Sequence, residues 1–143
     1  MRILIVSAGA TGAFIGSRLI EKRVDVTFLV RPERRRQLIT RGIMLQSPFG
    51  RFRRPVRAVV PGELEGFYDL IVLAVRAPDF GQALELSATA IGTDSIVLPV
   101  IEGIAHLLPT GNRFRPRLIA GVFEGRVNMD ADGILTQRPP TAE

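Results

Sequence analysis

The sequence contains no cysteine and no tryptophan, and its only lysine is Lys22. The absence of cysteine excludes disulfide bonds, thiolate catalysis and cysteine-ligated metals. No apolar run reaches the ~20 residues that a membrane-spanning helix needs. The chain opens directly with a strand-like apolar run, Met1–Val6, rather than a charged and then apolar leader. We therefore expect no secretory signal, no membrane contact and a cytoplasmic location.

Basic charge comes almost entirely from arginine. The net charge is +5, and eighteen of the nineteen basic residues are arginines. Such a surface attracts phosphate-bearing ligands, although a preference for arginine codons explains the same composition. Sheets that bind RNA interleave aromatic residues with basic ones. The eight phenylalanines and one tyrosine are not arranged in that way, so we expect no nucleic-acid partner.

Strand-like and helix-like patterns alternate along the chain. The 143 residues, 46% of them hydrophobic, are enough for one domain with a core. We expect a Rossmann-like α/β fold over residues 1–137, doubly wound around a mostly parallel sheet with helices on both faces, and a frayed tail at 138–143. The expected strands are 2–6, 24–30, 42–46, 51–60, 68–75, 94–101 and 117–123, with short strands within 127–136, and the expected helices are 10–22, 32–40 and 78–90.

A turn of small residues, Ser7-Ala8-Gly9-Ala10-Thr11-Gly12, separates the first strand from the first helix. The dinucleotide-binding fingerprint is Gly-x-Gly-x-x-Gly, and serine takes the first glycine position here. Gly9 lets the backbone approach a pyrophosphate, Gly12 lets the helix pack closely on the strand, and the helix N-terminus offers free N–H groups. If the backbone needs a glycine-like conformation at this position, Ser7 destabilises the fold by on the order of 1 kcal/mol relative to glycine. The turn predicts dinucleotide binding, with a purely structural glycine turn as the alternative.

Arg31 closes the second strand, at the position that reads the adenosine ribose in this type of fold. A carboxylate there accepts hydrogen bonds from a free 2′-hydroxyl, whereas the planar fork of an arginine suits a 2′-phosphate. Arg31 therefore predicts NADP(H) as the cofactor; the alternative is a solvated arginine that ends a strand. The next arginines, Arg34, Arg35 and Arg36, are expected on a solvated helix face, although one of them could flank the 2′-phosphate.

Two charged residues follow later strands and face the same crevice if right-handed crossovers bring the strand 68–75 beside the first strand. Arg76 could reach phosphates, a ribose or an acidic substrate, or it could form a strand-end salt bridge. Glu102 faces the crevice if the strand register holds. His106, the only histidine, is expected to be structural or exposed. No metal-ligand cluster and no set of catalytic residues can be argued from the sequence.

Together these segments resemble the N-terminal domain of ketopantoate reductases, over most of the chain. The matching segments are Met1–Val6 with the turn after it, Asp25–Pro32, Asp69–Arg76, Val97–Pro99 with Gly103, and Arg117–Val122. The family reduces ketopantoate to pantoate with NADPH, on the route to pantothenate and coenzyme A. The resemblance implies that Gly9, Ala10, Thr11 and Gly12 hold the pyrophosphate and that Arg31 holds the 2′-phosphate. It also implies that Arg76 replaces a lysine that contacts the cofactor.

The sequence departs from the family pattern at Ser7, at Arg76, and at Ile101-Glu102, which replace a Gln-Asn pair. A carboxylate at Glu102 would repel the carboxylate of a keto acid. The family's C-terminal helical domain, which supplies the catalytic lysine, has no counterpart within these 143 residues, and we expect that Lys22 cannot replace that lysine. We expect a cofactor-binding half that does not turn over alone and that self-associates through an uncovered apolar face. A non-catalytic NADP(H)-binding or interaction module is the alternative.

Overall fold

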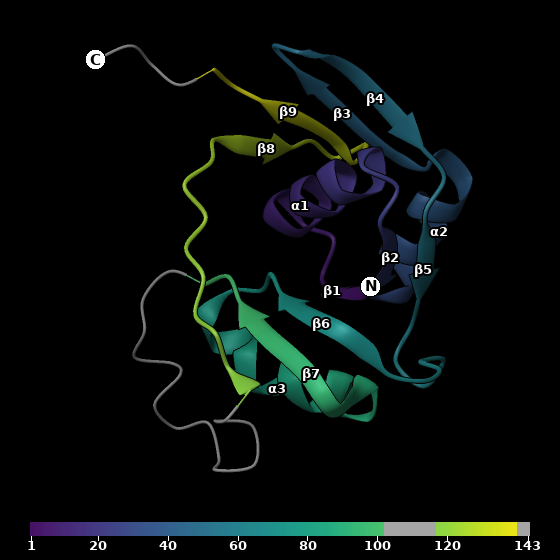
Figure 1. The fold of residues 1–143 in the computed structure, drawn as a ribbon. Helices are drawn as coiled ribbons and strands as arrows, with labels where there is room; N and C mark the ends of the chain where they lie inside the picture. The colour runs from purple at the N-terminus through teal and green to yellow at the C-terminus, as the bar shows by residue number, and fades with distance from the viewer. Residues whose placement is uncertain (102–116, 140–143) are drawn as a thin grey trace.

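Two β-sheets with a helix between them form the fold (Figure 1). The computed structural model describes residues 1–101 and 117–139. Sheet A is entirely parallel and has the strand order β5-β2-β1-β6-β7. Its strands are β1 (Arg2–Val6), β2 (Asp25–Leu29), β5 (Arg57–Val59), β6 (Tyr68–Leu73) and β7 (Ile91–Pro99). The order confirms the Rossmann-like prediction and places β6 beside β1, as right-handed crossovers require.

Helices cover both faces of sheet A. They are α1 (Ala10–Glu21), α2 (Pro32–Arg41) and α3 (Phe80–Ser87), the last flanked by the 3₁₀ turns η1 (Ala77–Asp79) and η2 (Ala88–Ala90). Pro32 is at the first position of α2, where its fixed φ and missing N–H cost nothing. One buried cluster joins α1 and α2 to sheet A around Phe28, and the second joins α3 to the opposite face around Leu73. Both clusters include side chains of the central strands β1 and β6.

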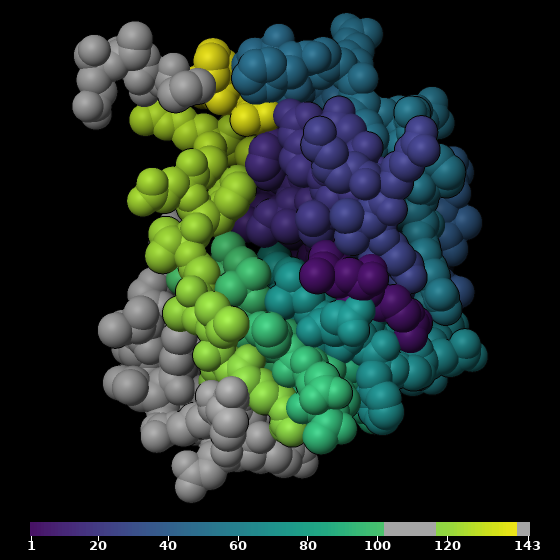
Figure 2. Space-filling model, viewed as in Figure 1, coloured from purple at the N-terminus to yellow at the C-terminus, as the bar shows by residue number. Residues whose placement is uncertain are grey.

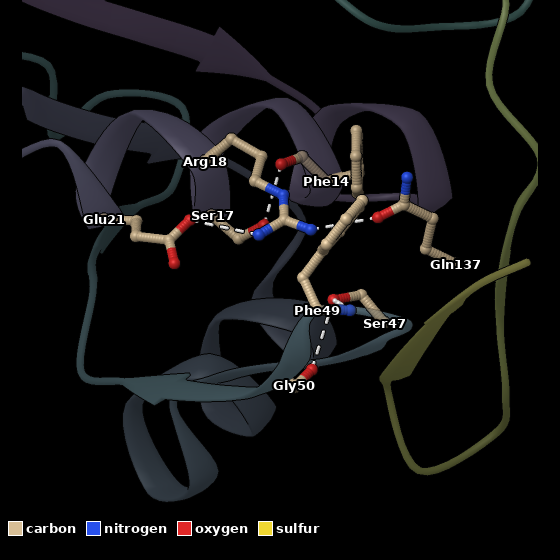
Figure 3. Close-up of polar contacts among 8 residues, drawn as sticks. All are labelled: Phe14, Ser17, Arg18, Glu21, Ser47, Phe49, Gly50 and Gln137. Atoms are coloured by element: carbon tan, nitrogen blue, oxygen red, sulfur yellow. Dashed lines mark hydrogen bonds and ion pairs between the residues drawn. The ribbon is translucent and has the colours of Figure 1, made fainter. Parts of the chain in front are cut away.

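Sheet B lies across α1 on the side away from sheet A (Figure 1). Its order is β4-β3-β9-β8, formed by β3 (Ile43–Ser47), β4 (Gly50–Arg54), β8 (Val127–Met129) and β9 (Ile134–Gln137). Arg18 of α1 is hydrogen-bonded to Glu21 at 3.0 Å and to Gln137 of β9 at 2.9 Å (Figure 3). These contacts attach the last described strand to the helix that begins at the small-residue turn.

Two predicted strands are wrong in their extent. Residues 51–60 do not form one strand: Pro55 has no N–H for a ladder, so β4 pairs in sheet B and β5 pairs in sheet A. Residues 117–123 form only isolated bridges, Val97 with Leu118 and Val100 with Gly121. This segment is largely exposed and connects the β7 side to sheet B along the surface (yellow-green in Figure 2).

The end of the described chain continues the pairing of sheet B. The backbone N–H of Arg138 donates to the carbonyl oxygen of Arg126 at 3.0 Å. The predicted fraying of the tail therefore does not hold for Arg138. Residues 140–143 of the predicted tail lie outside the described residues. Among the helices that the structure describes, none is long and apolar enough to cross a membrane.

Candidate functional site

The turn after β1 holds a serine in a conformation that glycine favours. Ser7 has φ of 78°, in the left-handed region that costs a residue with a Cβ atom about 1 kcal/mol or more. Its backbone N–H donates to the carbonyl oxygen of Leu29 at 2.9 Å, which connects the ends of β1 and β2. Its hydroxyl accepts a long hydrogen bond from the N–H of Gly9, at 3.4 Å. The glycine-like backbone considered for Ser7 is therefore present.

Gly12 lies beneath this turn, where no side chain fits. A Cβ atom added at Gly12 would collide with the carbonyl oxygen of Ser7. It would also lie 3.1 Å from the Cβ of Ala74 and 3.2 Å from Cγ2 of Ile5. The absence of a side chain lets α1 approach both β1 and the segment after β6. Gly12 therefore shapes the turn from below and is not among the residues that line the crevice above it.

The N-terminus of α1 is open. Gly9 is the N-cap residue, no side chain caps the helix, and the first helical hydrogen bond runs from the N–H of Ala13 to the carbonyl oxygen of Gly9. The N–H groups of Ala10, Thr11 and Gly12 precede that bond and cannot have a helical acceptor. The helix dipole adds positive potential at the same point, which makes this end of α1 suited to an anion.

A crevice of about 890 Å³ opens above the turn, at the carboxyl ends of the central strands. Parallel α/β sheets bind ligands at this position, because the loops that follow neighbouring strands meet there. Seven residues of the predicted site line this crevice: Ser7, Ala8, Gly9, Ala10, Thr11, Arg31 and Arg76. The structure thus brings together three loops that are far apart in the sequence.

The two predicted arginines lie at helix starts on the rim of this crevice. Arg31 is the N-cap residue of α2 and is exposed. No ion pair joins it to an acidic side chain within residues 1–101 and 117–139. Arg76 lies beyond the end of β6, as the N-cap of η1, with its side chain 85% exposed. It forms an ion pair with Asp79 at 3.2 Å, so the salt-bridge alternative is realised, and both residues still line the crevice.

The three consecutive arginines of α2, Arg34–Arg36, do not share one solvated face, so that prediction is wrong for Arg34. Arg36 is exposed, and Arg35 forms an ion pair with Glu63 at 3.0 Å. Arg34 is half-buried, and its Nε donates to the carbonyl oxygen of Ala8 at 3.0 Å. Burial lowers the pKa of the Arg34 guanidinium below its ordinary value. Arg34 also lines the crevice, next to the small-residue turn.

Several other lining residues were not predicted from the sequence. Asp79, Gln82 and Met129 contribute to the crevice wall. The three-residue spacing from Arg76 to Asp79 is a signal that could have revealed Asp79, because ion pairs form at that spacing in a helical turn. Met129 comes from sheet B, and no local pattern indicates that position. Glu102 and His106 lie outside the described residues.

Fold and turn together define a class: a Rossmann-type α/β domain with a turn of small residues at the start of its first helix. Within that class, the chain belongs to the ketopantoate reductase family. Residues 3–141 match the family model described as "Ketopantoate reductase PanE/ApbA". The match confirms the family resemblance deduced from the sequence.

Named relatives agree with this assignment, and a solved structure shares the fold. "Uncharacterized oxidoreductase YkpB" of Bacillus subtilis (strain 168) is 37% identical over 106 residues, 74% of this chain and 35% of the relative. A "2-dehydropantoate 2-reductase" of Mesorhizobium japonicum is 29% identical over 141 residues, 96% of this chain and 41% of the relative. A structure of D-mandelate dehydrogenase with NADH and anilino(oxo)acetate has a TM-score of 0.86 at 23% identity. That match covers 97% of this chain and 46% of the dehydrogenase chain. This chain therefore spans less than half the length of these proteins.

Proposed function

We propose that this chain binds NADP(H) in the crevice and forms the cofactor-binding half of an oxidoreductase that reduces a small 2-keto acid. One observation carries the proposal: the open N-terminus of α1 and the exposed Arg31 line the same crevice. A nicotinamide dinucleotide with a 2′-phosphate needs both features, a pyrophosphate site and a cation beside the ribose. The named relatives, an oxidoreductase and a 2-dehydropantoate 2-reductase, support this interpretation.

The residues of the crevice fit such a cofactor. The N–H groups of Ala10 and Thr11 have no helical acceptor and would hold the pyrophosphate. Gly12 keeps the turn free of side-chain bulk beneath the phosphates. The volume of about 890 Å³ is within the range for small-molecule and cofactor sites. When bound, the reduced nicotinamide supplies a hydride for a carbonyl carbon.

Arg31 supports NADP(H) over NAD(H). Its guanidinium has no carboxylate partner among the described residues, so its donors are available for a 2′-phosphate. The alternative cofactor is NADH, which accompanies D-mandelate dehydrogenase in the similar structure of that enzyme. We assign Arg76 to the opposite rim, where its charge would attract the diphosphate or the carboxylate of a keto acid.

Calorimetric titration of the chain with NADPH and NADH tests this proposal. We expect NADPH to bind at least about tenfold tighter, because charge-assisted hydrogen bonds contribute roughly 1.5–3 kcal/mol. Arg31→Ala should remove that preference, while Arg36→Ala, an exposed arginine of the same helix, should retain it. Failure of both cofactors to bind wild-type protein at millimolar concentration would overturn the proposal.

The described residues of the crevice include no suitable proton donor for the substrate. Among the described residues that line the crevice, the titratable side chains are Arg31, Arg34, Arg76 and Asp79. An arginine retains its proton in proteins, and the carboxyl group of Asp79 is engaged in the ion pair with Arg76, so none of them suits a general acid. We therefore propose that this chain binds and orients the cofactor and that a separate helical domain supplies the acid.

A non-catalytic NADP(H)-binding module is the second candidate, and the strained serine at the first glycine position favours it. Addition of a helical domain from a family member distinguishes the two candidates, with ketopantoate-dependent oxidation of NADPH as the readout. Turnover of the mixture, with none by the chain alone, supports the enzyme half. Cofactor binding without turnover in the mixture supports the module.

A further inference from the structure

Arg34 joins three segments of the chain at the edge of the crevice: the turn after β1, the helix α2, and the turn between β8 and β9. We propose that Arg34 is a positioning residue that aims the N–H of Gly9 at the pyrophosphate, and that the β8–β9 turn holds Arg34 in place. The inference rests on the proposed function, since it concerns how the same crevice binds its dinucleotide.

The first step is the hydrogen bond from Nε of Arg34 to the carbonyl oxygen of Ala8, at 3.0 Å. That carbonyl and the N–H of Gly9 belong to one peptide unit, which is planar, and the structure contains no cis peptide bond among the residues it describes. In a trans peptide the C=O and N–H point in opposite directions. A donor that fixes the carbonyl on one side therefore fixes the direction of the N–H of Gly9 on the other.

The N–H of Gly9 is available to a ligand. Its acceptor in the structure is the hydroxyl of Ser7 at 3.4 Å, a distance beyond the usual range for N–H···O bonds. Ser7 and Gly9 both line the crevice. A phosphate oxygen placed over the turn would replace this weak acceptor, provided that the peptide between Ala8 and Gly9 retains its orientation.

The second step is how Arg34 itself is held. Its Nη1 donates to Oε1 of Gln37, one turn further along α2. Nε2 of Gln37 donates in turn to the carbonyl oxygen of Ala131, at 3.2 Å, in the turn between β8 and β9. Arg41 and Asp132 add an ion pair at 2.8 Å between the same helix and the same turn. The turn is thus attached along one side of α2.

Gly133 of the β8–β9 turn lies directly against the side chains of Arg34 and Gln37. A Cβ atom at Gly133 would collide with Nη1 of Arg34 and would lie 2.9 Å from the side-chain amide of Gln37. Its φ of 80° is in the left-handed region that favours glycine. Arg34 is therefore enclosed between Gly133 and the turn after β1, and its position depends on both.

The guanidinium charge of Arg34 supports a role in binding in addition to a role in packing. No carboxylate forms an ion pair with Arg34 in the described part of the chain, and its Nη2 is buried without a hydrogen-bond partner there. A half-buried cation without a counter-charge is unfavourable for folding, so an apolar side chain of similar size would serve packing better. The charge of Arg34 would attract an anion on the far side of the Ala8–Gly9 peptide. This attraction stabilises the protein only when the anion is bound.

The test compares Arg34→Met, Arg34→Lys and, as a control, Arg36→Met, which removes an exposed charge from the same helix. NADPH and NADH are titrated separately into each protein, and unfolding curves confirm that each variant is folded. We expect Arg34→Met to weaken both cofactors by roughly tenfold and to leave their ratio unchanged, because pyrophosphate binding is common to both. Arg34→Lys should recover part of the loss, and Arg36→Met should bind like the wild type.

The amide resonance of Gly9 gives a readout that requires no ligand. It should shift in Arg34→Met and stay in place in Arg36→Met, because only the first variant releases the Ala8 carbonyl. Unchanged affinities in folded Arg34→Met would overturn the inference while leaving NADP(H) binding intact. Absence of binding by the wild type would instead refute the proposed function, so the two failures are distinguishable.

Gly133→Ala tests the support from the β8–β9 turn. Gly50→Ala is its matched control, because Gly50 also has a positive φ, of 121°, but nothing lies within 4 Å of an added Cβ atom. We expect Gly133→Ala to weaken both cofactors and to shift the Gly9 amide, and Gly50→Ala to do neither. Equal behaviour of the two variants would show that the β8–β9 turn does not hold Arg34.

Discussion

The backbone N–H of Ser7 donates to the carbonyl oxygen of Leu29 at 2.9 Å, across the ends of β1 and β2. This bond requires the chain to turn sharply after β1, and Ser7 achieves the turn with a φ of 78°. The strained residue is therefore the one that places the small-residue turn beside the position of Arg31. In this chain the geometry of the fingerprint is kept although its first glycine is replaced.

Replacement of the strained serine should stabilise the protein. Ser7→Gly relieves a left-handed conformation worth about 1 kcal/mol or more, and part of this gain is offset by the greater flexibility of glycine in the unfolded chain. We expect the free energy of unfolding in urea to rise by about 0.5–1 kcal/mol. Arg23→Gly is the matched control, because Arg23 is the other described non-glycine residue with a positive φ, 62°.

The two variants separate stability from binding. Both should stabilise the protein by similar amounts, but only Ser7→Gly also removes the hydroxyl that competes for the N–H of Gly9. We expect Ser7→Gly to bind NADPH at least as tightly as the wild type, and Arg23→Gly to leave affinity unchanged. Weaker binding by Ser7→Gly would mean that the hydroxyl is itself a ligand of the phosphates.

A methyl group at Gly12 should disrupt the site from below. Gly12→Ala places Cβ against the carbonyl oxygen of Ser7, which cannot move without breaking the turn. We expect a loss of about 1–3 kcal/mol in the free energy of unfolding, typical of overpacking, together with loss of NADPH binding. Gly81→Ala in α3 is the control, since nothing lies near its added Cβ atom, and it should be neutral or stabilising. Normal binding by Gly12→Ala would show that α1 can move away from the sheet.

Sequence patterns were sufficient for the parts of the fold that local chemistry determines. The continuous apolar runs predicted the buried parallel strands, and the small-residue turn predicted where α1 begins. The placement of Ser7–Thr11, Arg31 and Arg76 around one crevice followed from strand order alone. Each of these features depends on neighbours in the chain or on the handedness of crossovers.

The features that were missed depend on contacts between distant segments. Three consecutive arginines in α2 look alike in the sequence, and only the position of the β8–β9 turn determines that Arg34 is the one enclosed. Similarly, the apolar residues of 117–123 suggest a strand, yet they form only isolated bridges with Val97 of β7 and with Val100 just after it. Pro55 is a local signal for the break between β4 and β5, although the residues on both sides of it continue a strand-like pattern.

Apolar side chains beside β7 should cause self-association. Ile119 and Val122 are 54% and 84% exposed, and the segment that carries them runs beside β7, with the N–H of Ile119 bonded to the carbonyl oxygen of Val97 at 2.9 Å. Exposed apolar surface of this kind favours contact between copies. We expect sedimentation velocity to show mass rising with concentration, less so in Val122→Ser. Phe49→Ser, at an exposed turn of sheet B, is the control. A mass that stays monomeric at high concentration would contradict this expectation.

Asp79 restrains Arg76 in an ion pair at the crevice, and removal of the Asp79 charge should strengthen cofactor binding. The ion pair between Arg76 and Asp79 is exposed and contributes little to stability, so Asp79→Asn should unfold at nearly the same urea concentration as the wild type. The same change frees Arg76 and removes a negative charge from the crevice wall. We expect NADPH affinity to rise severalfold, with the gain diminishing as salt is added. Glu63→Gln, which breaks the ion pair of Arg35 outside the crevice lining, should change affinity much less. Equal gains from both variants would assign the effect to net charge, and a loss in Asp79→Asn would mean that Asp79 holds Arg76 in its binding position.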